Sequence, residues 1–103
     1  MDMKFRLEIV TGSILRKNIV KREFHAEDVI GARAFALTCI REAGEDAIVL
    51  RALLSYGNGV AIGHIFPPNT NGHDCFQWCG INGSQRFVIE NDGNLGGRLS
   101  REG

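Results

Sequence analysis

The sequence lacks an excess of either charge, a long apolar run and a rich supply of cysteine. Twelve Lys and Arg residues balance twelve Asp and Glu residues, so no overall field draws the chain to nucleic acid or to an anionic membrane. No apolar run is long enough to span a bilayer, and the first ten residues, MDMKFRLEIV, lack the layout of a signal peptide. The three cysteines cannot all pair within one chain. We therefore expect a cytoplasmic protein with free thiols and no membrane contact.

The rest of the composition is that of an ordinary globular domain. The 103 residues are 44% hydrophobic and 23% charged, which is enough apolar material for one core. No linker, repeat or low-complexity segment divides the chain. The sequence predicts a single domain over residues 1–93, followed by a flexible glycine-rich tail over residues 94–103.

Residues 3–24 predict two strands around a turn at residues 11–13. Apolar and charged side chains alternate over residues 4–9, which is the pattern of a strand with one buried face. A three-residue turn sets Glu8 opposite Arg16. Beyond this pair apolar and charged residues no longer alternate regularly, which predicts a bulge or a frayed edge.

Residues 26–43 have the periodicity of a helix that ends at Gly44. Apolar residues recur every three or four positions and form one stripe, rich in alanine, that can lie close to a sheet. Two residues break this pattern. Arg33 lies within the stripe, where it either extends its alkyl stem towards solvent or is an interface arginine paired with a carboxylate. Phe35 lies outside the stripe, as an ordinary exposed residue or as an anchor for a partner.

Residues 46–66 predict a second hairpin, closed by a Gly-Asn-Gly turn. If Tyr56 lies opposite Val60, the same register sets Ala52 opposite His64. This face is almost wholly apolar, so we expect it to lie under the helix. On this face His64 is interpreted as a hydrogen-bonded core residue rather than as a catalyst.

The stretch NGHDCFQWCGING is predicted to be a loop and a strand that leads into a two-residue Asn-Gly turn. This turn sets Trp78 opposite Phe87 and leaves Cys75 and Cys79 on the other face of the sheet. Four residues along a strand span about 13 Å, which is too far for a disulfide or a shared zinc ion.

Two chemical readings of the same stretch remain weaker. One is a metal site completed by His64 or His73, and the other is a catalytic thiol supported by His73 and Asp74. Adjacent residues in a loop rarely give a base and its orienting group the required geometry. We expect no metal, no cofactor and no catalytic residue.

The predicted fold is α+β, with an antiparallel, strongly curved sheet of about five to six strands and one packed α-helix, in the order β-β-α-β-β-β-β. One helix covers only two or three strands. In the predicted register Val49, Leu53 and Ile65 lie on the face away from the helix. Either the sheet curls on itself or another chain covers this face.

These patterns favour a non-enzymatic protein-interaction module, as a homodimer or with a protein partner. Its interaction surface is predicted at Arg33, Phe35, Val49, Leu53 and Ile65. Small accessory and inhibitor proteins of phages or mobile elements share this size and lack of motifs, which is an analogy only.

Two alternatives stay open. The first is a small-ligand-binding protein or enzyme with a pocket between helix and sheet near Tyr56, His64 and Cys75. The second is a weak nucleic-acid binder that uses the basic strand from Arg16 to Arg22. The neutral net charge makes nucleic acid the less favoured partner, and the same basic residues can instead protect a sheet edge.

Overall fold

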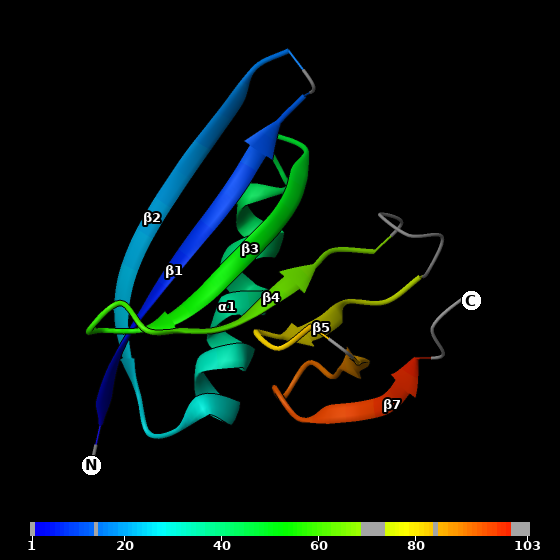
Figure 1. Cartoon of the computed structure of the whole chain (residues 1–103). Coiled ribbons are helices and arrows are strands. Elements are labelled where there is room, and N and C mark those ends of the chain that lie inside the picture. Colours follow the sequence, from blue (N-terminus) through cyan, green and yellow to red (C-terminus); the bar gives the residue numbers. More distant parts are fainter. Residues whose placement is uncertain (1, 14, 69–73, 84, 100–103) are drawn as a thin grey trace.

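The computed structural model describes residues 2–13, 15–68, 74–83 and 85–99. They form one helix and one antiparallel sheet that curves and stays open, which confirms the predicted α+β class (Figure 1). The strand order across the sheet is β2-β1-β3-β4-β5-β6-β7, so β2 and β7 are its edges. In chain order the elements are β1 (Met3–Gly12), β2 (Lys17–Ala26), α1 (Val29–Ala43), β3 (Val49–Tyr56), β4 (Ala61–Phe66), β5 (Gln77–Gly80), β6 (Arg86–Ile89) and β7 (Leu95–Leu99).

The first hairpin is longer than the sequence pattern indicates. Glu8 of β1 lies opposite Lys21 of β2, so the predicted register, with Glu8 opposite Arg16, is wrong. The chain turns between Ser13 and Arg16, where the Ser13 N–H donates to the Arg16 carbonyl at 2.8 Å. Because β2 is an edge strand that the helix covers only in part, nearly all of its residues are exposed. This exposure explains why the apolar alternation blurs there.

The helix begins three residues later than predicted, because Asp28 caps it. The Asp28 carboxylate accepts a hydrogen bond from the Gly31 N–H at 2.8 Å, as expected for a helix N-cap. The helix ends at Ala43, and Gly44 is its C-cap, as predicted. Figure 1 shows α1 lying across one face of the sheet, where it packs against β1, β2 and β3.

A bulge in the second hairpin changes which residues lie under the helix. The turn closes as predicted, but Ile62 then has no partner in β3. Leu53, and not Ala52, therefore lies opposite His64. The predicted register is wrong by one residue beyond this point, and a one-residue slip moves each following side chain of β4 to the other face.

Two predicted surface residues are consequently core residues. Ile65 is moved under the helix by the bulge at Ile62, and Val49 is moved there by a second irregularity, where the β1–β3 register skips Leu50. A signal for the first bulge is present at Gly63, because glycine inside a strand often marks a bulge or a close approach. The indole of Trp78 lies against Gly63, and a Cβ atom there would meet its Cζ2 atom at 2.5 Å.

The third hairpin has the predicted register. Trp78 lies opposite Phe87, and Cys79 lies opposite Arg86. Cys75 precedes β5, and both cysteines are free thiols. Residues 95–99, predicted as part of a flexible tail, form β7 and pair with β6.

The C-terminal strands curl towards the helix around Arg33. The Arg33 Nε–H donates to the Gly93 carbonyl at 2.7 Å, and its guanidinium lies 4.9 Å from the centre of the Trp78 ring. The turn between β6 and β7 passes so close to α1 that a Cβ atom at Gly93 would collide with the Ile30 carbonyl. The sheet thus curves around the helix without closing, and Trp78 and Ile89 of its C-terminal strands are buried in the core.

Candidate interaction surface

Among the described residues, the ten-residue strand β2 forms one edge of the sheet and has a neighbouring strand on one side only. The Ser13 N–H donates to the carbonyl of Arg16, the residue opposite it, so odd-numbered residues of the first strand and even-numbered residues of the second are bonded to each other. The Lys4 carbonyl accepts from the Gly57 N–H, so even-numbered residues of β1 are bonded on the β3 side. Because backbone groups alternate in direction along an antiparallel strand, the even-numbered residues of β2 face β1. The odd-numbered residues turn their N–H and C=O groups outwards. They are Lys17, Ile19, Lys21, Glu23 and His25.

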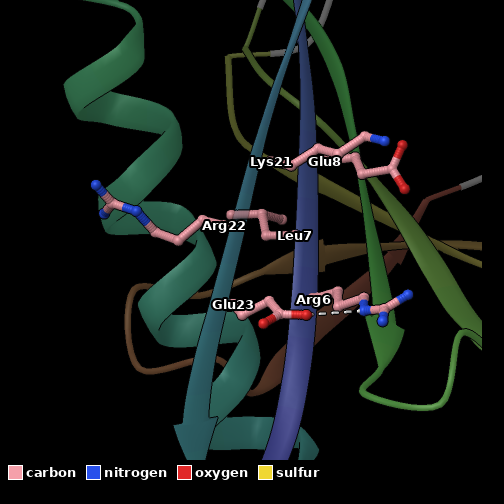
Figure 2. A pocket seen from close by; sticks show the side chains of 6 residues that line it. All are labelled: Arg6, Leu7, Glu8, Lys21, Arg22 and Glu23. Carbon is pink, nitrogen blue, oxygen red and sulfur yellow. Dashed lines mark hydrogen bonds and ion pairs between the residues drawn. The ribbon is translucent and has the colours of Figure 1, made fainter.

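The sheet face away from the helix carries rows of opposite charges next to this edge. Glu23 accepts a hydrogen bond from Arg6 Nε at 3.1 Å and lies 3.3 Å from Lys4 Nζ. These two cations, Lys4 more than Arg6, hold the pKa of the Glu23 carboxyl below its ordinary value. Lys21 and Glu8 lie opposite each other in the next row. Between the two rows is a shallow hollow of about 300 Å³ (Figure 2).

The flank of β2 that faces the helix carries Val20 and Phe24 on either side of Arg22, and Phe24 is buried, 9% exposed. Val20 is 47% exposed, and Phe35 of α1 is 40% exposed. The Phe35 ring packs against the Phe24 ring of β2, with 4.4 Å between the ring centres. Val20 and Phe24 are four residues apart, or about 13 Å along the strand. We call Val20, Phe24 and Phe35 the apolar strip.

A cavity of about 340 Å³ lies between the C-terminal half of α1 and the first two strands, with Val20 in its wall. Arg22 turns into the same space, and Figure 2 shows its side chain pointing towards the helix. Its Nη1 donates to the Cys39 Sγ at 3.2 Å and lies 3.8 Å from the Glu42 carboxylate. The other lining residues are Ile9, Thr11, Ala43, Asp46 and Ala47.

The structure leaves two of the five predicted surface residues accessible. Arg33, Val49 and Ile65 are 9%, 9% and 0% exposed, so they do not line a surface. Leu53 is half-buried on the face away from the helix. Phe35 lies on the helix side, next to the β2 edge, so the two accessible residues do not form one patch.

The three predicted pocket residues also lie apart. Tyr56 is on the helix side and packs against Phe5, with 5.7 Å between the ring centres. His64 is on the opposite face, 6.2 Å from the ring of Phe66. Cys75 precedes β5 and lines a different hollow, with Arg41 and Glu90. Hollows between the helix and the sheet lie instead beside Cys39 and beside Ile40 and Phe76.

The predicted basic strand is divided between the two faces of the sheet. Arg22 turns under the helix to Cys39 and Glu42, whereas Lys21 lies on the open face. A phosphate backbone running along one face therefore meets only part of this charge.

Within the described residues, no three His, Cys, Asp or Glu side chains gather closely enough to hold a metal ion. Asp74 is described and exposed. His73, proposed as a metal ligand or a catalytic base, lies outside the described residues.

Comparison with known proteins gives no relative: no family model, no curated protein and no solved structure matches this chain. No helix in the described part of the chain is long and apolar enough to cross a membrane.

Sequence reasoning missed Val20, Phe24 and Glu23, because the edge position of β2 depends on strand order across the whole sheet. A local signal was present in the stretch IVKREFHA. Val20 and Phe24 share one parity, and Lys21 and Glu23 share the other. The first of these sets also contains Arg22 and the second contains Ile19, so the pattern indicates a strand with a more apolar and a more charged flank but does not single out the site.

Proposed function

We propose that this chain is a small, non-enzymatic protein-interaction module that pairs the free edge of β2 with a strand of another polypeptide chain. The observation that carries the proposal is the ten-residue edge strand with its outward backbone groups. In strand addition, backbone hydrogen bonds supply affinity and alternate side chains supply specificity. β2 offers both, since charges flank it on one face and the apolar strip on the other.

The mixed charges favour a protein strand over a nucleic acid. Charged side chains often block edge pairing, but here Lys21 and Glu23 have opposite signs at neighbouring outward positions. A strand with the complementary pattern gains from both, whereas a phosphate backbone is repelled by Glu23 and Glu8. The exposed parts of Val20 and Phe35 also favour a protein partner.

Amide hydrogen exchange, followed by NMR at low and high protein concentration, tests this proposal. In dilute protein the outward N–H groups of Ile19, Lys21 and Glu23 should exchange quickly. The inward N–H groups of Val20 and Arg22 should be protected by β1. Raising the concentration, or adding a peptide of residues 17–26 as a probe strand, should slow the outward set alone.

The inward amides are the internal control, because local unfolding of β2 would expose both sets together. Outward amides that are already protected in dilute protein would show that the edge is not free. Association that leaves them unprotected would show that another surface binds. Either result contradicts the proposal.

A further inference from the structure

Taking the proposed use of the β2 edge as given, we infer that its partner is a second copy of this chain, joined about a twofold axis at Arg22. The two β2 strands run antiparallel, and the two sheets form one continuous sheet. Three features of the described residues support this arrangement: the symmetry of the edge, its charge pattern and the cavity beside Val20.

Symmetry limits the register to a few choices. In a twofold pairing of antiparallel edges the axis stands perpendicular to the sheet, so one residue lies opposite its own copy. The side chains of directly opposed residues point to the same face of the joined sheet. A residue on the helix side of one copy therefore lies opposite a residue on the helix side of the other. An axis at Lys21 or at Glu23 sets like charges against each other, which is destabilising.

Overlap decides among the remaining positions. An axis at Val20 places Phe24 beyond the end of the partner's strand, and an axis at Phe24 does the same to Val20. An axis at Arg22 pairs residues 18–26 of both copies, so Val20 and Phe24 both lie opposite residues of the partner strand. It is also the position closest to the middle of the strand.

The charges and the apolar residues are complementary in this register. Lys21 lies opposite the partner's Glu23, and the symmetric pair repeats the contact on the other side of the axis. On the helix side, Val20 lies opposite the partner's Phe24. The two copies of Arg22 meet at the axis, but each guanidinium turns under its own helix towards Glu42 and Cys39.

The cavity gives the second copy a place to insert. Near one end of β2 the ring of Phe35, 40% exposed, lies against the buried ring of Phe24. Towards the other end, Val20 borders the cavity that also contains Cys39. The axis at Arg22 exchanges the two ends of the strand. The rings of one copy therefore lie beside the cavity of the other, twice per dimer.

Disulfide cross-linking tests the register directly. Even-numbered residues of β2 form the closely spaced pairs with the partner strand, with Cα atoms about 4.5 Å apart, which suits a disulfide. In a background of Cys39→Ala, Cys75→Ser and Cys79→Ser, mild oxidation should link Arg22→Cys to its own copy. A mixture of Asn18→Cys and Ala26→Cys should link the two variants, and it leaves Arg22 intact.

The matched controls are Asn18→Cys alone and Val20→Cys alone, which should give at least about tenfold less linked dimer because their copies lie too far apart. Efficient linkage of Val20→Cys would move the axis to that residue and overturn the inference. Linkage of none of the variants would overturn it as well, with circular dichroism confirming that each variant is folded.

A charge exchange tests the same pairing without cysteine. Lys21→Glu should raise the dimer Kd about tenfold, because two attractive pairs become repulsive. Adding Glu23→Lys to the same chain should lower the Kd again, since the pairs between the copies then reappear with reversed signs. The recovery should be partial, because Glu23→Lys also breaks the pairs of Glu23 with Lys4 and Arg6 of its own chain. A double variant as weak as the single one would overturn the register.

The two proposals fail differently. A dimer that protects the outward β2 amides but cross-links elsewhere overturns the axis at Arg22 and leaves strand pairing intact. If the protein is a monomer and its outward amides become protected only when a different chain is added, the inference that the partner is a second copy is overturned and strand pairing stands. A dimer that leaves these amides unprotected overturns both.

Discussion

Replacing Arg33 by Met should destabilise the fold without weakening association. Methionine keeps the length and flexibility of the side chain but removes the charge and the donors. The structure places Arg33 between α1 and the C-terminal strands, 9% exposed, with the Trp78 ring and the Gly93 carbonyl as its partners. The substitution therefore acts on the joint that holds the two parts of the sheet around the helix.

The magnitude follows from these contacts. A hydrogen bond from a charged donor contributes about 1.5–3 kcal/mol, and a cation over an indole adds about 1–2 kcal/mol. Burial of the guanidinium, which lowers the pKa of Arg33, offsets part of this gain. The expected loss is about 2–3 kcal/mol of unfolding free energy, or roughly 10 °C in Tm for a domain of this size.

Urea denaturation and thermal melting, each run with sedimentation of the native protein, measure both effects. The expected result is a lower midpoint in both transitions and an unchanged dimer Kd. Arg33→Lys is the matched control, and it should recover only part of the stability, because an ammonium group cannot stack on the indole as a planar guanidinium does. An unchanged midpoint with weaker association would refute the reasoning and return Arg33 to the interaction surface.

Three further tests, one of them with a control variant, separate packing, surface and charge. Gly63→Ala should cost about 1–3 kcal/mol in urea denaturation, because its Cβ would meet the Trp78 ring at 2.5 Å. Gly80→Ala, with nothing within 4 Å of the added atom, should cost almost nothing, and equal losses would contradict the packing. Phe35→Ala should lower the unfolding free energy by about 1–2 kcal/mol and also weaken the dimer in sedimentation; a lower stability with an unchanged dimer would remove Phe35 from the interface. The pKa of Glu23 is lower in the folded protein than its ordinary value of 4.5. Its contribution to the free energy of unfolding is therefore complete above pH 4.5 and is lost as the pH falls through the lower, folded pKa. Acid titrations of stability should therefore fall less for Glu23→Gln than for the wild type, and identical curves would show that the ion pairs add nothing.

The parts of the fold that local patterns determine were predictable. The helix and its end at Gly44 follow from apolar periodicity and a C-cap glycine. The pairing of Trp78 with Phe87 follows from an Asn-Gly turn, which fixes both the loop length and the register. In both cases the residues that decide the structure are near neighbours in the sequence.

The other registers depend on irregularities that such patterns do not show. The bulges at Leu50 and Ile62 moved Val49 and Ile65 from the predicted surface into the core. Gly63 was the available signal for one of them, but its reason, the Trp78 ring, is distant in the sequence. Periodicity alone could not locate either bulge.

The candidate site was predictable only in part. Arg33 and Phe35 stood out from the helix pattern, yet the partners that assign their roles, Gly93 and Phe24, come from other elements. The β2 edge became a candidate only with the strand order, which is a property of the whole sheet. The basic residues of this strand were recognised, whereas Glu23 among them was not.

The central claim is that the free edge of β2 binds the same edge of a second copy, and sedimentation equilibrium of the wild type, Lys21→Pro and Lys21→Ala tests it most directly. Proline removes an outward N–H from the edge and leaves the inward hydrogen bonds to β1 in place. Alanine removes the side chain alone. The account predicts a wild-type dimer, a weaker dimer for Lys21→Ala and a monomer for Lys21→Pro. A Lys21→Pro variant that is folded and dimerises as well as Lys21→Ala would contradict it.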